Sequence, residues 1–456
     1  MLSIGGERTP GFKLTLAIIV GLVLTVPLFS IWLLVYDRKT QSQEATASIT
    51  EGWGAAQAVS GPLLVIPYRT TATETVVQNG QSLTRTNQVT RELVLAPETV
   101  ELSTVLHPEL RRRSIYEAVV YQAGFSGKAR FAFPPDLART KVDPSQMDLG
   151  NAELHFGVSD PRGLGANPRV IANGQSLRLQ PGEGGSGGSG FFAGFDASAL
   201  AERPLTIDYA YELRGSEALG LMPQSGDTRW TVRSTWPSPS FGGAFLPGAR
   251  HVSDKGFDAA YRIGNLALGR SLVSTADSGR PPTPERPTPA AGDASPQSAQ
   301  ISLIQPVDPY SQVNRATKYG FLFIGFTFLA LLMFDVVGGV HVSAVEYLLV
   351  GAALVLFFVL LLALAEVIGF TPAYVVASAA IAGLNTAYSA AVLASRRRAA
   401  YIGALLVGLY GVLYILLSLE AYSLLIGSLL LFAALAGVMY ATRRIDWAAP
   451  RTTAVA

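Results

Sequence analysis

The sequence predicts an α-helical membrane protein with six transmembrane helices, one N-terminal and five C-terminal, and a large all-β, sandwich-like extracytoplasmic domain. Three observations support this fold class. Apolar residues fill the last third of the chain, and a second apolar stretch lies near the N-terminus. Between them, roughly 270 residues contain short β-favouring runs separated by Gly, Pro and Asn.

The N-terminal stretch predicts an uncleaved membrane anchor. Residues 1–13 are expected to form a cytoplasmic N-terminus, residues 14–36 a transmembrane anchor helix, and residues 37–60 a juxtamembrane helix of good helix formers. A cleaved signal peptide is the alternative. The apolar run is longer than the about 7–15 residues of a signal-peptide core, and no small-residue cleavage site follows it closely, which favours the anchor.

Residues 61–315 predict an extracytoplasmic β-rich domain, which the family resemblance given below makes periplasmic. Its clearest strands alternate with a period of two, which places every second side chain on one face. The apolar faces of these strands contain Leu205, Ile207, Tyr209, Tyr211 and Leu213, and Trp230, Val232, Ser234 and Trp236. Val100, Leu102, Thr104 and Leu106 alternate less cleanly. Two low-complexity segments interrupt this pattern: residues 182–190 predict a flexible Gly/Ser-rich loop, and residues 274–300 predict a Pro-rich disordered loop.

The C-terminal block at residues 319–440 predicts five membrane-spanning helices. A helix needs about 20 apolar residues to cross a bilayer, and a run of five such segments is not typical of buried helices in a soluble core. The segments are 319–337, 347–365, 372–393, 401–419 and 422–440, and residues 441–456 form the expected cytoplasmic tail.

Positive charges in short loops predict the orientation. With six spans, the loop at Arg396, Arg397 and Arg398 lies on the same side as Arg443 and Arg444 and as the N-terminus with Arg8 and Lys13. This side is expected to be cytoplasmic. The cations at Arg38, Lys39, Arg315 and Lys318 lie on the predicted outer side and oppose this assignment.

The composition excludes several classes of function. A net charge of +2 gives no basic surface for nucleic acid, and the absence of cysteine excludes disulfides and thiolate metal sites. The four histidines are far apart, and the motifs of hydrolases, metalloproteases and nucleotide-binding proteins are missing. We therefore predict no catalytic, cofactor-binding or metal-binding residue, and no enzymatic activity.

Polar residues within the apolar block are candidate functional groups, because ionisable side chains at membrane depth are costly. Asp335 and Glu366 lie at predicted helix ends, where water-exposed anchoring is the simpler interpretation. Asn385 lies deeper, where bonding to a neighbouring helix is more common than contact with a substrate.

The β-rich region offers two candidate partner-binding sites. Asp160 and Arg162 are one, although Asp followed by Pro is more typical of a turn with a locally paired arginine. Trp236 and Phe241 are the other, as an exposed aromatic edge, although residues at a strand end more often line the core.

Several short strings together resemble the inner membrane protein CreD family, linked in bacteria to cell envelope integrity. They are Trp53-Gly54 with Gln57 and Ser60-Gly61-Pro62, Ile66-Pro67-Tyr68, Ser159-Asp160 with Arg162-Gly163-Leu164, Trp236-Pro237 with Ser240-Phe241, Phe245-Leu246-Pro247, the segment from Tyr310 to Gly320, and Arg443-Arg444-Ile445-Asp446-Trp447. The sequence departs from the family at Ser418 to Tyr422 and in its Gly- and Pro-rich insertions. The resemblance implies a Gram-negative inner membrane protein tied to envelope-stress signalling, with no assigned catalytic residue.

Three hypotheses for function follow. The leading one is a non-enzymatic protein that contacts the lipid bilayer and binds a periplasmic protein or cell-wall component through its β domain; the sequence does not predict its oligomeric state. A transporter or lipid-handling protein, built around Asn385, Glu366 and Asp335, is the second. The third is an envelope enzyme, which requires an acid and a base close together in an outer-domain cleft.

Overall fold

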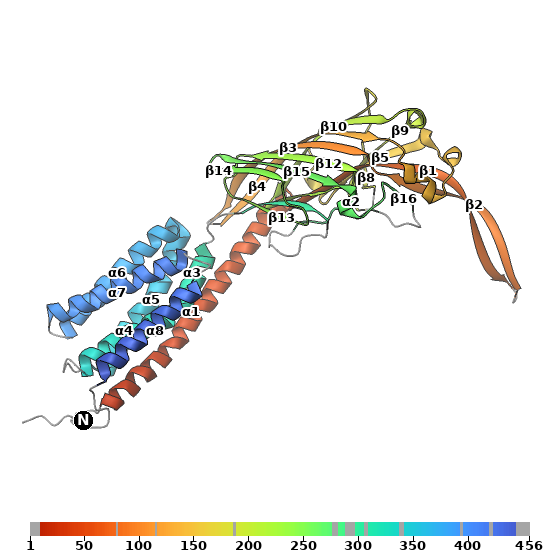
Figure 1. The fold of residues 1–456 in the computed structure, drawn as a ribbon. Coiled ribbons are helices and arrows are strands. Elements are labelled where there is room, and N and C mark those ends of the chain that lie inside the picture. The colour runs from red at the N-terminus through yellow and green to blue at the C-terminus, as the bar shows by residue number, and fades with distance from the viewer. Residues whose placement is uncertain are drawn as a thin grey trace, which may run out of the picture. The chain divides into compact units, whose positions relative to one another are not determined.

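The computed structural model describes residues 10–78, 81–114, 116–185, 188–275, 281–287, 297–304, 309–336, 342–392, 395–418 and 423–443. The chain forms two compact units, coloured along the sequence in Figure 1. The helix unit comprises Met1–Gln43 and Val307–Ala456, and the β unit comprises Glu44–Pro306. Each unit is described by itself.

The helices of the helix unit are mainly apolar, with the exception of the polar α3 (Pro309–Lys318). They are α1 (Pro10–Trp53), which continues into the β unit, α3 (Pro309–Lys318), α4 (Gly320–Val336), α5 (Ala344–Ile368), α6 (Phe370–Val392), α7 (Arg396–Ser418) and α8 (Ser423–Thr442). Within the described residues, α1, α5, α6 and α7 are long and apolar enough to cross a membrane, and α3 with α4, bent by 41° at their junction, gives a fifth span if the pair is counted as one. The count of six spans remains a prediction.

The predicted juxtamembrane helix at 37–60 is too long at its C-terminal end. Helix α1 ends at Trp53, and Gly54 closes its last turn by donating its N–H to the carbonyl of Thr50 at 2.8 Å. Gly54 has a φ of +140°, and a Cβ there would lie 2.8 Å from the carbonyl oxygen of Arg214. Only glycine fits this close approach, so the helix stops and the first strand begins at Gln57.

Two β-sheets form the β unit. In the described residues the first sheet has nine strands: β1 (Gln57–Gln78), β2 (Gln81–Leu95), β5 (Ala152–Val158), β8 (Gln180–Glu183), β9 (Ser189–Phe195), β11 (Ala218–Met222), β13 (Pro239–Gly243), β16 (Val273–Thr275) and β17 (Ala299–Leu303). Its order is β13-β17-β11-β1-β5-β9-β8, with β2 paired to β1 and β16 to β2. Strands β1 and β11 pair in parallel, and the other pairs are antiparallel.

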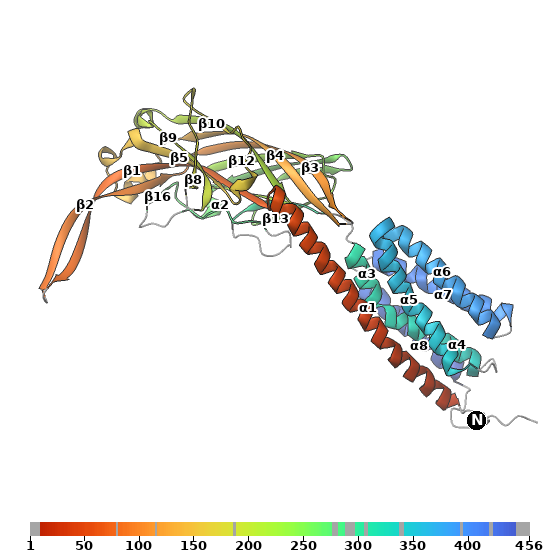
Figure 2. The same ribbon diagram turned by 180° about the vertical axis from the view of Figure 1, so that it is seen from behind.

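The second sheet has eight described strands: β3 (Thr99–Arg113), β4 (Tyr116–Phe131), β6 (Arg169–Ala172), β7 (Gln175–Ser176), β10 (Leu205–Ser216), β12 (Asp227–Ser234), β14 (Ala249–Ser253) and β15 (Gly256–Gly264). Its order is β14-β15-β12-β3-β4-β10-β6-β7. Strands β12 and β3 pair in parallel with Trp230 opposite Leu102. The layered strands are visible from behind in Figure 2.

The two sheets share one hydrophobic core. The alternation predicted for β3, β10 and β12 is confirmed, because the apolar positions of each strand are buried while most of the intervening positions are exposed. Aromatic rings join the sheets: the Phe156 ring meets Tyr209 edge to face at 5.2 Å, and the Phe191 ring meets Tyr211 at 5.6 Å. Such contacts add to the burial of apolar area that stabilises the domain.

Both low-complexity predictions need correction. The Gly/Ser-rich segment is the connection of the β8–β9 hairpin, and only 186–187 lie outside the described residues. Its glycines allow close packing: a Cβ at Gly182 would lie 2.6 Å from the Phe192 ring, and one at Gly190 would lie 2.0 Å from the Phe156 carbonyl oxygen. Small side chains here serve contact between strands rather than flexibility.

The predicted disordered loop at 274–300 also contains ordered structure. Its ends belong to β16 and β17, and residues 281–287 lie against the β unit, where Gln224 Nε2 donates a 3.0 Å hydrogen bond to the carbonyl of Pro282. Arg286 of the same segment contacts the Asp160 carboxylate. Residues 276–280 and 288–296 lie outside the described residues.

Candidate functional site

Asp160 lies directly after β5, at the start of a short 3-10 turn (Pro161–Gly163), and its side chain is buried with 2% exposed. Arg162 forms a bidentate pair with it, with Nε 2.9 Å from Oδ1 and Nη2 2.7 Å from Oδ2. Arg286 adds a contact of 3.4 Å to Oδ2. The hydrogen bonds from Arg162 hold the pKa of the Asp160 carboxyl below its ordinary value.

Gln57 fixes the backbone at this position. Its amide donates to the carbonyls of Asp160 at 3.1 Å and Arg214 at 3.0 Å, and its Oε1 accepts from the N–H of Asp160 at 3.2 Å. A fully buried glutamine with satisfied hydrogen bonds joins β1, the turn and β10. The predicted local pairing of Arg162 with Asp160 is therefore present. The Asp160 carboxylate caps the turn and contacts two guanidinium groups that are half exposed to solvent.

Trp236 and Phe241 are partly buried and packed against the main core. The indole N–H of Trp236 donates to the carbonyl of Ile304 at 3.1 Å, and the Phe241 ring meets Phe257 edge to face at 5.7 Å. Phe241 lies on β13, and three strands separate β13 from β5 in the sheet order, a distance of about 19 Å at the usual strand spacing. The two predicted sites of the β unit therefore do not form one surface.

The two candidate acidic residues of the helix unit, Asp335 and Glu366, lie at opposite ends of it. Asp335, near the end of α4, is buried with 1% exposed, and its Oδ1 lies 2.5 Å from the ammonium of Lys13 on α1. Glu366, near the end of α5, accepts a 3.2 Å hydrogen bond from the Tyr310 hydroxyl and lies 4.0 Å from Arg38 Nε. Lys13 and Arg38 are about 38 Å apart along α1, so the two acids do not share a site. The expectation that Asp335 is a water-exposed anchor is wrong, because Lys13 and the helices enclose it.

Asn385 lies on α6, separate from both acids. It is buried with 1% exposed, as is Ser389 one turn later with 2%. Neither Asn385 Nδ2 nor Ser389 Oγ has a hydrogen-bond partner among the described residues. The expected hydrogen bond from Asn385 to a neighbouring helix is thus not found there, and two polar groups face the interior of the helix unit unsatisfied.

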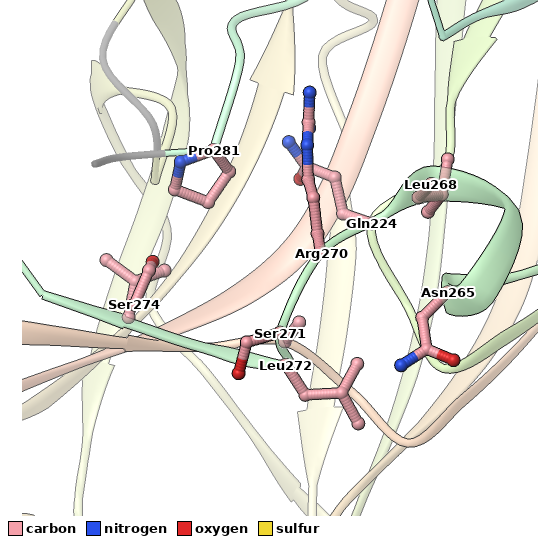
Figure 3. A pocket seen from close by; sticks show the side chains of 10 residues that line it. Gln224, Asn265, Leu268, Arg270, Ser271, Leu272, Ser274 and Pro281 are labelled. Carbon is pink, nitrogen blue, oxygen red and sulfur yellow. The ribbon is translucent and has the colours of Figure 1, made fainter. Parts of the chain in front are cut away.

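The β unit contains a small enclosed pocket beside α2 (Asn265–Leu268), shown in Figure 3. Arg270 extends next to Gln224 there, and burial lowers the pKa of the Arg270 guanidinium. The free volume is about 20 Å³, enough for a single water molecule. This pocket is too small for a substrate.

A more open groove of about 470 Å³ lies on the outer face of the second sheet, over β3, β12, β14 and β15. His251 and Asp258 line it and are opposite each other in the β14–β15 register. Asp258 is bound to Arg233, whose Nε lies 2.7 Å from Oδ1. His251 and Asp258 are thus the neighbouring base and acid that the enzyme hypothesis requires. They lie on an open strand face, however, and Asp258 is already paired with Arg233.

Comparison with known proteins covers both units. The chain matches the family described as Inner membrane protein CreD over residues 9–448. It is also 31% identical over 430 residues to Inner membrane protein CreD of Escherichia coli (strain K12), covering 93% of this chain and 91% of that protein. The chain belongs to the CreD family. Its apolar helices are accordingly those of a protein of the inner membrane, and the family resemblance expected from the sequence is confirmed.

Sequence reasoning missed several contacts that the CreD fold makes. Gln57 and Arg286 surround Asp160 from 103 and 126 residues away, and Lys13 reaches Asp335 across 322 residues. No periodicity or motif links such distant positions. The one available signal was an acid inside an apolar helix, since a buried charge requires a partner.

Proposed function

We propose that this CreD-family protein is a non-enzymatic inner membrane protein of the envelope-integrity type, whose β unit binds a periplasmic protein. We further propose six spans, with both termini in the cytoplasm and residues 61–315 in the periplasm. The distribution of Lys and Arg over short loops supports this orientation. The family supports an envelope-associated membrane protein.

The observation behind the binding proposal is a two-stranded arm formed by residues 69–78 of β1 and 81–90 of β2. Its pairs run from Arg69 opposite Thr90 to Gln78 opposite Gln81, a length of about 34 Å. Figures 1 and 2 show the two strands extending past the rest of the β unit. This arm is the most extended feature of the β unit.

Both edges of the arm lack a strand partner within the described residues. On one side β5 pairs with β1 as far as Val65, with an isolated bridge at Tyr68, and on the other β16 reaches Leu93 of β2. Residues 85–88 are exposed. A two-stranded ribbon is marginally stable alone in water, and an open strand edge binds extended peptide by main-chain hydrogen bonds. These properties favour binding by strand addition.

To test this, residues 71–88 are replaced by Asn-Gly, which preserves the pairing of Thr70 with Val89 and supplies a favoured hairpin turn. Cells producing this variant should lose envelope-stress resistance, and a photoreactive residue at Arg85 of the full chain should capture a periplasmic protein. The matched control replaces Asp254-Lys255, in the β14–β15 turn, by Asn-Gly. It should retain resistance.

The alternative function is a transporter or lipid-handling protein that uses the helix unit. The unsatisfied Nδ2 of Asn385 beside Ser389 favours it, because buried polar groups in lipid without partners often mark a ligand site. Asn385→Leu distinguishes the two proposals. If cells with Asn385→Leu lose envelope-stress resistance while cells with the shortened arm (71–88 replaced by Asn-Gly) keep it, binding by the β unit is excluded as the main function.

A further inference from the structure

A groove of about 570 Å³ opens on the surface of the helix unit between α1, α3 and α4. Its walls are mainly apolar: Val26, Phe29 and Phe321 are each more than half exposed. Along α1 the Phe29 ring stacks on Trp32 at 5.5 Å, and Trp32 stacks on Tyr36 at 6.3 Å. Such an aromatic row on a membrane helix offers a continuous surface to a lipid chain.

One charged residue, Lys318 at the end of α3, lines this groove. The side chain of Lys318 is exposed, and the described residues provide it with no hydrogen bond or ion pair. The other two lysines described in this unit differ, since Lys13 contacts Asp335 at 2.5 Å and Lys39 contacts the Ser311 hydroxyl at 3.5 Å. Lys318 is therefore a cation with no counter-ion from the described protein.

The position of Lys318 along the helices places it inside the apolar zone. The contact between Lys39 and Ser311 aligns the start of α3 with the polar end of the anchor stretch on α1. Lys318 follows Ser311 by seven residues, which is about 10 Å along α3, and the groove brings it beside Phe29 and Trp32. A charge at that depth needs an anion or must extend to the headgroup level.

Both threonine hydroxyls of the groove already donate to backbone carbonyls within their own helices. The Thr317 hydroxyl donates to the carbonyl of Val313 at 2.9 Å, and the Thr25 hydroxyl donates to that of Leu22 at 2.6 Å. The groove thus combines one available cation with long apolar walls. We propose that it binds one anionic phospholipid, with the lipid phosphate on the Lys318 ammonium and the acyl chains along Val26, Phe29 and Phe321.

The test uses the full chain reconstituted in vesicles of equal parts phosphatidylglycerol and phosphatidylcholine. After extraction in mild detergent, native mass spectrometry counts the lipids that remain bound. The wild type should retain the anionic lipid over the zwitterionic one by about fivefold, the factor expected for one lysine near anionic lipid. Lys318→Gln should abolish this preference, and Lys318→Arg should keep it.

Two controls separate the groove from general attraction to charge. Lys39→Gln removes a lysine at the polar end of α1, outside the groove, and should leave the preference intact. Phe29→Ala with Phe321→Ala should lower the retention of both lipids. The melting temperature of each variant is measured in the same detergent, and we expect it to match that of the wild type, which shows that lost lipid retention does not come from unfolding.

Several outcomes would overturn the proposal. One is equal retention of both lipids by the wild type, and another is an equal loss of preference in Lys39→Gln and Lys318→Gln. Displacement of the bound lipid by glycerol phosphate would show that a free phosphate occupies the site. A disulfide between two chains of the Val26→Cys variant, with no lipid retained, would assign the groove to a contact between copies, and the cysteine-free sequence makes that result unambiguous.

Discussion

The two units each bury an aspartate, and they neutralise it differently. In the β unit Asp160 is 2% exposed and contacts both Arg162, two residues away, and Arg286. In the helix unit Asp335 is 1% exposed and contacts Lys13, 322 residues away, with Oδ2 left unsatisfied among the described residues. Among the described residues, the Asp160 carboxylate therefore has two cationic partners and the Asp335 carboxylate has one.

The two ion pairs have different roles in the fold. The Asp160 pair organises a local turn, and its guanidinium groups are half exposed, so water shares in solvating the charge. The Lys13 side chain is 17% exposed, and its contact joins α1 to α4 at the start of the chain's first apolar helix. Removal of one cation should therefore have unequal consequences in the two units.

The largest effect is expected for Lys13→Met. This change leaves the Asp335 carboxylate buried without a cation among the described residues, and breaking a buried pair costs about 3–5 kcal/mol. The free energy of unfolding, measured by titrating dodecyl sulfate into maltoside micelles, should fall by about 3 kcal/mol, near the lower end because Lys13 is partly exposed.

Two variants complete that measurement. Lys13→Met combined with Asp335→Leu removes both charges and should recover most of the lost stability. Lys39→Met removes the lysine whose ammonium contacts a neutral hydroxyl at 3.5 Å, and it should cost less. If Lys39→Met destabilises the protein as much as Lys13→Met does, the buried pair has no special role.

A smaller effect is expected for Asp160→Ala in the β unit. The substitution removes the charged hydrogen bonds to Arg162 and the cap of the turn, and it should lower the free energy of unfolding by about 2 kcal/mol. Arg162→Gln should cost less, because Arg286 still faces the carboxylate. Tryptophan fluorescence reports unfolding of the β unit through the fully buried Trp230.

The Asp160 pair also predicts a pH dependence. The folded-state pKa of Asp160 is lowered by Arg162, so its stabilising effect is present above the ordinary carboxyl pKa of 3.8 and is lost as pH falls through the folded pKa. The difference in melting temperature between the wild type and Asp160→Asn should be full at pH 7 and should shrink below about pH 4. A difference that stays constant over this range would contradict the ionic role.

The sequence predicted what depends on local pattern. The alternation of β10 and β12, the apolar helices and the pairing of Arg162 with Asp160 all follow from residues close together in the chain. The Gly/Ser-rich segment was misjudged because the composition does not show that Gly182 lies against the Phe192 ring and Gly190 against the Phe156 carbonyl. Small residues look the same in sequence whether they provide flexibility or close contact.

The contacts of the candidate sites were also predicted only where the partners are close together in the chain. Nothing along the chain indicates that Lys13 meets Asp335 or that Gln57 supports Asp160, because these contacts form only when distant elements pack. The helix boundary at Trp53 was placed too late for a similar reason. Good helix formers continue past it, but the carbonyl of Arg214 on β10 approaches Gly54 and imposes the break.

A third acid, Glu217, differs from both aspartates because no cation pairs with it among the described residues. It joins β10 to β11 with a φ of +60°, and its side chain is partly buried without a hydrogen bond or ion pair among the described residues. Burial raises the pKa of the Glu217 carboxyl above its ordinary value. Folding therefore shifts the protonation equilibrium of Glu217 toward the neutral acid, which is the reverse of the shift at Asp160.

Replacing this carboxylate should give the smallest effect, with the opposite sign. Because the folded-state pKa of Glu217 is raised, the wild type loses stability as pH rises through that pKa, and Glu217→Gln removes this loss. The variant should melt slightly above the wild type at pH 7 and at the same temperature near pH 4, below the ordinary value of 4.5. A lower melting temperature at pH 7 would mean that the carboxylate has a cationic partner, and the contrast between paired and unpaired acids would then fail at this position.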